Sequence, residues 1–215
     1  MLYEIGSVDP RRSEEPMTGE PISTSNCQKF RTVNPISRLL IGRFYSRLAT
    51  IVRQLQPASV LDAGCGEGET IFRLRPLLPD DVLGCDANPE CVRFASERFD
   101  EFHFSVKDIY DLPYATGQFD LVLCLEVLEH LERPQQALEQ LWRVTKKHLI
   151  VSVPQEPFFR FGNFLRGKYL GTLGNHPEHI QHWNRRRFRQ FLAQRVDQVE
   201  VHSCGPWLIA HGRKE

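Results

Sequence analysis

Three glycines at alternate positions follow a short apolar run, and they are the residues best suited to hold a ligand. The run Val60–Ala63 has the composition of a buried strand, and Gly64, Gly66 and Gly68 come directly after it. Glycine lets the backbone turn sharply where a strand ends and approach a ligand closely without a Cβ in between. A helical pattern begins at Glu69, so the sequence predicts a strand–loop–helix unit whose loop contacts a small molecule.

The spacing of this loop disfavours a dinucleotide. A pyrophosphate-binding loop has the pattern GxGxxG, whereas Glu69 occupies the third glycine position of that pattern here. An acidic loop repels pyrophosphate but tolerates a sulfonium amino acid. The loop therefore favours S-adenosylmethionine (SAM), which has no phosphate, over NAD.

Two aspartates farther along the chain are placed to bind the adenosine part of such a ligand. Asp86 ends the second predicted strand, at the spacing from the glycines where a carboxylate accepts both ribose hydroxyls. Asp108 follows the third predicted strand, where an acidic side chain can accept a hydrogen bond from the adenine amino group. Because the carboxyl ends of parallel strands meet at one edge of a sheet, these residues are expected at a single site.

Strands and helices alternate along the chain, and this order predicts a parallel, doubly wound sheet. The predicted strands are 60–63, 82–86, 102–106, 119–125 and 148–153, followed by a closing pair at 196–204 and 207–210. The predicted helices are one that starts at Asn34 and is stopped by Pro57, 69–78, 89–99, one that begins at Pro134, and 185–194. The segment 154–183 interrupts the alternation and is rich in glycine and aromatic residues, so it is predicted to be an insert. It could be a lid over an apolar acceptor, a patch that touches a lipid surface, or an element that packs on the edge of the sheet.

Composition indicates one domain in a reducing compartment. Of the 215 residues, 1–26 are proline-containing and polar, typical of a flexible arm, and 27–215 are assigned to the domain. The charged residues balance at 27 basic and 27 acidic, which gives no reason to expect a nucleic-acid partner. No apolar run approaches the ~20 residues that span a bilayer, no signal peptide is evident, and the six cysteines form no CxxC pair. We therefore expect a cytoplasmic protein.

These motifs resemble the class I SAM-dependent methyltransferases, particularly their small-molecule branch. The stretches that carry the resemblance are VLDAGCGEGET, GCDANPECV, KDIYDLPYATGQFDLVLCLEVLEHL and LIVSVPQEP. The resemblance extends from about Asn34 to the C-terminus. It implies an enzyme with SAM as cofactor and a Rossmann-like, mostly parallel seven-stranded α/β sheet with an antiparallel C-terminal strand.

The resemblance also implies roles for particular residues. The glycines would border the methionine moiety, Asp86 would bind the ribose, and the residues from Asp108 would frame the adenine. The residues that it assigns to the cofactor are Asp62, Gly64, Cys65, Gly66, Gly68, Asp86, Ala87, Asp108, Ile109, Leu125 and Glu126. One departure is that 144–148 stands where family members often have a Gly-Gly turn, which affects a turn and not the cofactor site.

Catalysis is assigned to the turn after the fourth predicted strand, which contains Glu126, Glu129 and His130. Transfer to a hydroxyl requires a base, and an imidazole with an unperturbed pKa near ~6.5 is suited to that role. The same residues could instead cap a helix and brace the loop. The leading interpretation is methyl transfer to a small, partly apolar metabolite without a metal.

Two other functions stay open. Glu126, Glu129, His130 and His179 are similar to the metal site of small-RNA 3′-end 2′-O-methyltransferases, in which a divalent ion polarises the ribose hydroxyls. The zero net charge opposes this alternative, although the arginines of 185–189 form a local basic cluster. The third possibility is a non-catalytic protein that binds SAM.

Overall fold

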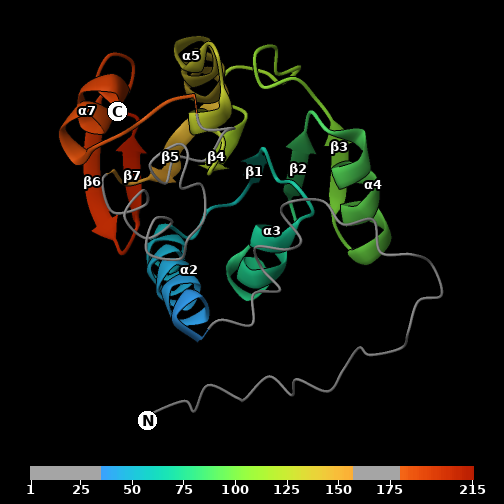
Figure 1. Ribbon diagram of the computed structural model, residues 1–215. Coiled ribbons are helices and arrows are strands. Elements are labelled where there is room, and N and C mark those ends of the chain that lie inside the picture. Colours follow the sequence, from blue (N-terminus) through green and yellow to red (C-terminus); the bar gives the residue numbers. More distant parts are fainter. Residues whose placement is uncertain (1–34, 157–179) are drawn as a thin grey trace.

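The computed structural model describes residues 35–156 and 180–215, which build one seven-stranded sheet (Figure 1). Its strand order is β3-β2-β1-β4-β5-β7-β6. The parallel strands are β1 (Val60–Ala63), β2 (Val82–Asp86), β3 (His103–Val106), β4 (Phe119–Leu125) and β5 (Thr145–Pro154). Strand β7 (Trp207–Arg213) is antiparallel to both β5 and β6 (Gln198–Cys204). The predicted fold class, with its antiparallel C-terminal strand, is confirmed.

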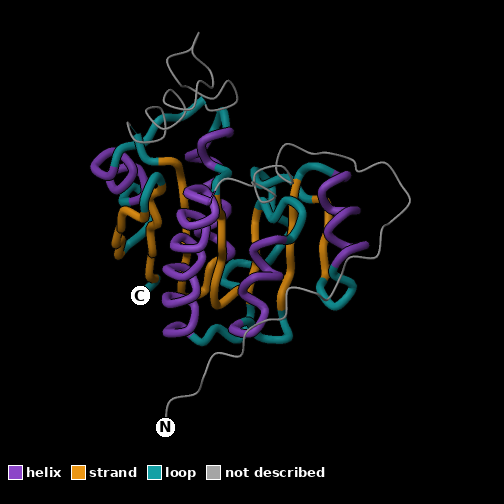
Figure 2. The backbone as a smooth tube through the Cα atoms, turned by 60° about the horizontal axis from the view of Figure 1, so that its bottom comes forward, coloured by secondary structure: helices purple, strands orange, loops and turns teal. Residues whose placement is uncertain are grey.

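Helices cover both faces of this sheet (Figure 2). On one face, α2 (Pro35–Leu55) and α3 (Glu69–Leu74) contribute Leu48 and Ile71 to a buried cluster. On the other face, α5 (Pro134–Val144) and α7 (Arg185–Leu192) contribute Leu138 and Phe188 to a second cluster. Helix α4 (Pro89–Arg98) lies against β2 and β3. The apolar residues of each helix recur at helical spacing because only one side of the helix meets the sheet.

Several element boundaries differ from the prediction, and the early end of α3 has an identifiable reason. Helix α3 ends at Leu74, not Leu78, and a 3₁₀ turn over Arg75–Leu77 follows it. Pro76 lies in that turn, and proline both lacks an N–H and clashes with the carbonyl of the preceding helical turn. Strand β5 begins at Thr145, not His148, directly after α5.

The hydroxyl of Thr145 replaces the turn that family members often have at this point. Its Oγ1 donates to the carbonyl of Leu141 at 2.7 Å, so the last turn of α5 is satisfied by a side chain. The chain therefore passes from α5 to β5 without a glycine.

Two later elements also end at other residues than predicted: α7 stops at Leu192 and β7 continues to Arg213.

The sheet cysteines are buried, as predicted. Cys65, Cys85 and Cys124 are free thiols with at most 8% exposure. Burial raises the pKa of Cys85 to about 12, and it raises the pKa of the other two thiols as well. These thiols therefore behave as small apolar core residues.

In the described part of the chain, no helix combines the length and the apolar character needed to cross a membrane.

Candidate functional site

The glycine loop lies at the carboxyl end of β1, and its backbone conformation requires glycine. Gly64, Gly66 and Gly68 have φ values of 83°, 52° and 78°. A Cβ on Gly64 would lie 2.3 Å from a methyl group of Val127, and one on Gly68 would lie 2.9 Å from the ring of Phe104. These contacts are closer than real carbon atoms approach, so the chain itself forms the cradle here.

Asp86 ties this loop to the end of β2. Its Oδ2 accepts a hydrogen bond from the backbone N–H of Gly66 at 2.9 Å, and its Oδ1 accepts from the N–H of Asn88 at 2.8 Å. A carboxylate offers about four lone-pair positions, so both oxygens can still accept from ribose hydroxyls. The structure thus brings together the predicted ribose ligand and the predicted methionine loop. The neighbouring Ala87 is exposed beside them.

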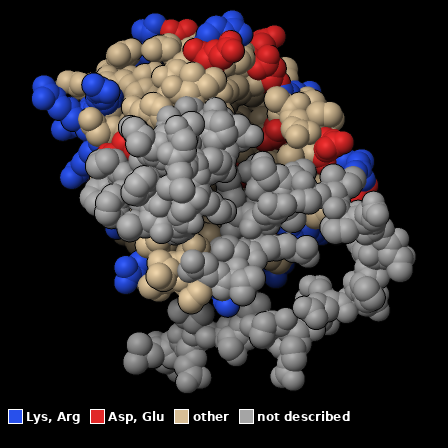
Figure 3. Space-filling view, viewed as in Figure 1, with Lys and Arg blue, Asp and Glu red and all other residues tan. Residues whose placement is uncertain are grey.

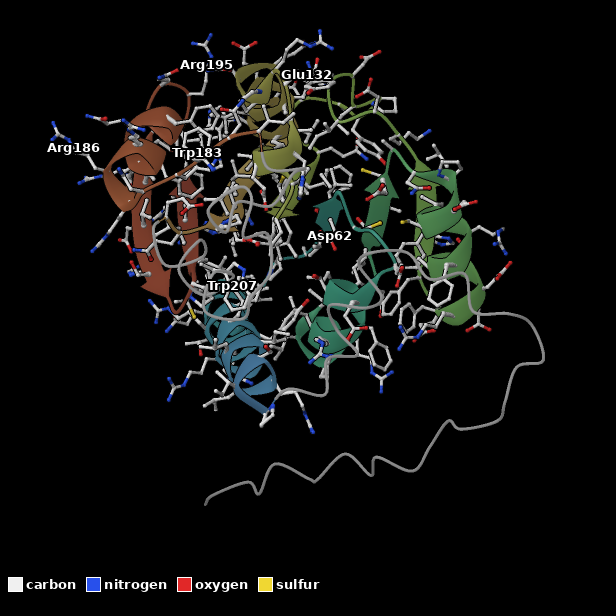
Figure 4. The ribbon with its side chains drawn as sticks, viewed as in Figure 1. Asp62, Glu132, Trp183, Arg186, Arg195 and Trp207 are labelled. Atoms are coloured by element: carbon white, nitrogen blue, oxygen red, sulfur yellow. The ribbon has the colours of Figure 1, made fainter. Side chains whose placement is uncertain are left out.

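Asp62 lies within β1 at the centre of the molecule (Figure 4) and is only 1% exposed. Its Oδ2 has no hydrogen-bond partner among the described residues. Desolvation, and secondarily the charge of Asp86, raises the pKa of Asp62 to about 7. A buried carboxyl without a partner costs about 1–3 kcal/mol, and a nearby cation would favour its ionised form. The ammonium and sulfonium groups of SAM fit this environment.

The remaining predicted cofactor residues lie at the same edge but differ in what they can contact. Asp108 Oδ1 accepts from the N–H of Tyr110 at 2.9 Å, which shapes the loop after β3, and Ile109 packs against the core. The thiol of Cys65 is buried beside Gly84 and donates to the carbonyl of Gly66 at 3.7 Å. Leu125 is half-buried at the end of β4.

Glu126 has an unusual backbone conformation that β5 holds in place. Its φ is 57°, a region that residues other than glycine seldom adopt. The hydroxyl of Ser152 donates to Glu126 Oε1 at 2.8 Å and accepts from its N–H at 3.2 Å, while the same N–H reaches the Ser152 carbonyl at 3.1 Å. Strained residues cluster at active sites. Ser152 was not among the predicted site residues; its signal in the sequence is a hydroxyl within a buried apolar strand.

Glu129 and His130 lie in a 3₁₀ turn over Leu128–His130 and face different environments. The side chain of Glu129 is 1% exposed and that of His130 is 30% exposed, with 3.9 Å between Oε1 and Nε2. The carbonyl of Glu129 accepts from the N–H groups of Ile180 and Gln181, at 2.9 and 3.0 Å. The side chain of His130 is therefore accessible to solvent, whereas that of Glu129 is buried.

Trp183 joins the segment before α7 to the residues that follow β5. The sequence did not predict this contact. Its carbonyl accepts from the N–H of Glu156 at 2.8 Å, and its indole packs against Phe188 and Phe191 (Figure 4). Since Ile180 is bonded to the turn after β4, the residues that flank 157–179 both lie at the carboxyl edge. Insert residues 157–179, His179 among them, and arm residues 1–26 lie outside the described residues.

No group of three histidine, cysteine, aspartate or glutamate side chains able to hold a metal ion occurs within 35–156 and 180–215. His179, one of the four residues of the alternative metal site, lies outside the described residues, so the structure does not place that site as a whole.

Residues 61–151 match the protein family described as Methyltransferase domain. Over these residues the chain is similar to methyltransferase domains. The chain is 34% identical over 94 residues to the mitochondrial ubiquinone biosynthesis O-methyltransferase of Saccharomyces cerevisiae, covering 39% of this chain and 28% of that protein. It is 32% identical over 95 residues to ajmaline N-methyltransferase of Rauvolfia serpentina, covering 41% and 33% respectively.

A solved structure shows the same fold over most of this chain. Magnesium protoporphyrin IX methyltransferase from Synechocystis PCC 6803, with bound SAH, superposes with a TM-score of 0.65 at 19% identity, covering 89% of this chain and 95% of that one. SAM is the cofactor of this domain. The chain spans about a third or less of the length of the two curated relatives, so their activities and substrates do not transfer to it directly.

Proposed function

We propose that this protein transfers the methyl group of SAM to a small, partly apolar metabolite. The observation that carries the proposal is the cradle at the carboxyl ends of β1 and β2, where Asp86 is bonded to Gly66 and Oδ2 of the buried Asp62 lacks a partner in the described chain. Bound SAM supplies an electrophilic methyl carbon. Because methyl transfer is an in-line displacement, the main task of the protein is to position the acceptor.

Apolar side chains at the rim support a partly apolar acceptor. Ile36 and Leu39, in the first turns of α2, are 62% and 56% exposed, and Ile180 is 53% exposed. Leu40 approaches within 3.2 Å of the position that a Cβ on Gly205 would take, so this end of α2 reaches the β6–β7 turn. That turn lies at the edge where β5 ends. Exposed apolar groups therefore flank the region in which an acceptor would lie.

His130 is the residue that we assign to proton removal when the acceptor is a hydroxyl. It is partly exposed, and the carboxylate of Glu129 lies 3.9 Å from its Nε2, where it can orient the ring and stabilise its protonated form. We assign Glu126 to orientation of the acceptor, because Ser152 fixes its carboxylate. Glu129 acts through His130 in this proposal and does not touch the acceptor.

Calorimetric titration of SAM into the full chain tests the cofactor half first. We expect binding in the micromolar range that is lost in Asp86→Ala. Gly42→Ala is a suitable control, because nothing lies within 4 Å of a Cβ at that position. No binding by the folded wild type would refute the proposal.

Radiolabel transfer from SAM to a panel of phenols, amines, carboxylic acids and a short RNA with a free 3′ end tests the acceptor half, with and without EDTA. Transfer to a small molecule that is insensitive to EDTA supports the proposal. EDTA-sensitive transfer to the RNA would support the metal-dependent alternative. Tight SAM binding without transfer to any member of the panel would favour a non-catalytic SAM-binding protein.

A further inference from the structure

Three arginines of α7 line a hollow beside the last strand of the sheet. Arg185, Arg186 and Arg189 share with β6 a hollow of about 880 Å³. Figure 3 shows basic side chains gathered over α7, and Figure 4 shows Arg186 extending away from that helix. The opposite side of α7 is anchored in the core by Phe188, which is fully buried. The helix is therefore fixed, and its arginines are presented to the outside.

These three guanidinium groups lack a carboxylate partner within the described chain. Some other arginines are paired with carboxylates: Arg195, just beyond α7, bonds Glu139 with its Nε at 2.9 Å, and Arg93 bonds Glu97 at 2.9 Å. Glu200 is the one carboxylate among the residues that line the hollow, and its Oε2 lies 3.5 Å from Nε2 of His202. The hollow therefore has an excess of positive charge that the described residues do not neutralise.

An open strand edge lies next to this charge. Among the residues that the structure describes, β6 is the outermost strand of the sheet and pairs with β7 alone. Residues 199–202 of β6 line the hollow together with α7. The outer edge of such a strand presents N–H and C=O groups that another extended chain can pair with.

We propose that this hollow binds an extended acidic segment of a partner protein, which adds a strand to β6 and places its carboxylates on the three arginines. Strand addition supplies main-chain hydrogen bonds, and the side-chain contacts supply selectivity. The planar guanidinium fork of arginine matches a carboxylate with two parallel hydrogen bonds. The hollow combines both elements within one short stretch of the surface.

Charge distinguishes this occupant from two others. Pairing of two copies through β6 would bring two sets of three arginines together, which like-charge repulsion opposes. A nucleic acid makes no use of a strand edge, and the side chain of Glu200, which is 77% exposed, would repel its phosphates. The proposal concerns α7 and β6 and does not depend on methyl transfer.

Titration of defined probes into the isotope-labelled full chain tests the proposal. The probes are the acidic peptide Thr-Glu-Val-Glu-Val-Glu-Thr, the same peptide with lysine for glutamate, and a single-stranded oligouridylate, all at about 0.15 M salt. We expect the acidic peptide to shift the amide resonances of β6 and to slow their hydrogen exchange. Its affinity should fall about tenfold in the triple variant Arg185→Gln, Arg186→Gln, Arg189→Gln and should rise in Glu200→Lys.

A matched variant separates this surface from an effect of net charge. Arg53→Gln, Arg75→Gln, Arg93→Gln removes the same charge from exposed arginines elsewhere and should leave the peptide affinity unchanged. An equal loss in both triple variants, equal binding of the lysine peptide, or shifts outside β6 and α7 would overturn the proposal. Tighter binding of oligouridylate through the same arginines would also overturn it, in favour of a nucleic-acid surface. Thermal unfolding of each variant verifies that it is folded.

Discussion

The two halves of the proposed site are built in different ways. On the cofactor side, at the ends of β1 and β2, the main chain forms the cradle: Gly64 and Gly68 have positive φ, and the N–H of Gly66 bonds directly to Asp86. On the acceptor side, at the ends of β4 and β5, side chains perform this task, and the hydroxyl of Ser152 holds Glu126. The cofactor side is therefore fixed mainly by backbone geometry, and the acceptor side mainly by contacts between side chains.

This difference has a functional consequence. A backbone cradle needs glycine at its positive-φ positions, so few substitutions can replace these residues. An acceptor pocket made of side chains can change with little effect on the fold. Substitutions in the two halves should accordingly separate SAM binding from methyl transfer.

Gly64→Ala should have the largest effect, because it alters the backbone half directly. The added Cβ would lie 2.3 Å from Val127 and would impose a φ of 83° on alanine. Strain of this kind costs about 1–3 kcal/mol, and the clash with Val127 adds to that cost. SAM affinity, measured by calorimetry, should therefore fall about a hundredfold or more.

Two further variants separate the clash from the strain. Gly64→Ala with Val127→Ala removes the clash but not the φ penalty, and it should recover only part of the affinity. Gly42→Ala, in helix α2 with open space around the new Cβ, should leave SAM binding unchanged and stabilise the protein by about 0.5–1 kcal/mol. Full SAM affinity in Gly64→Ala alone would contradict the backbone account of this half.

The cofactor half could be predicted from the sequence for the same reason. A glycine loop after a strand and an aspartate at the end of the next strand are local patterns, and the structure places Gly66 and Asp86 in contact as expected. The predicted strand boundaries, which also depend on local sequence patterns, were largely correct. Helix α3 was predicted too long because Pro76 was not counted as its stop.

The acceptor half could not be predicted to the same extent. The contact of Ile180 with Glu129 and that of Trp183 with Glu156 join segments whose proximity only the folded chain defines. Nothing in the order of residues indicated that Glu129 would be buried while its neighbour His130 stayed accessible. The burial of one member of the predicted triplet depends on how the chain before α7 packs over the turn.

Asp86→Asn should have the next largest effect. The amide retains the size of the carboxylate but has one acceptor oxygen, so it cannot satisfy Gly66, Asn88 and two ribose hydroxyls together. Hydrogen bonds to a charged group contribute about 1.5–3 kcal/mol, which predicts a loss of SAM affinity of about ten- to a hundredfold. Calorimetry measures this loss, and an unchanged dissociation constant would exclude Asp86 as the ribose ligand.

Asp62→Asn should change stability and cofactor affinity in opposite directions. The pKa of Asp62 is raised from 3.8 to about 7, so the folded state retains a proton that the unfolded chain releases, and stability falls as pH rises across that window. The variant lacks this loss and should be more stable than wild type by about 1–3 kcal/mol at about pH 8, with little difference at about pH 4. Urea unfolding at both values measures the difference.

The same substitution removes the charge that we assign to the cations of SAM. Wild-type affinity should weaken as pH falls through about 7, whereas the affinity of Asp62→Asn should be lower and nearly independent of pH. A stability difference that is equal at both pH values would show that this carboxyl does not titrate in the predicted range.

Ser152→Ala should have the smallest effect and should fall entirely on the acceptor half. Loss of the hydroxyl releases Glu126 Oε1, and one hydrogen bond of this kind is worth about 1–1.5 kcal/mol, so kcat should fall about tenfold on the acceptor identified by the radiolabel panel. SAM affinity should stay within about twofold of wild type, because the backbone cradle is untouched. Ser152→Thr keeps the hydroxyl and should restore kcat, whereas Ser96→Ala, which removes a hydroxyl bonded within α4, should change neither quantity. A loss of SAM binding in Ser152→Ala that matches the loss of kcat would mean that the two halves are coupled through β5.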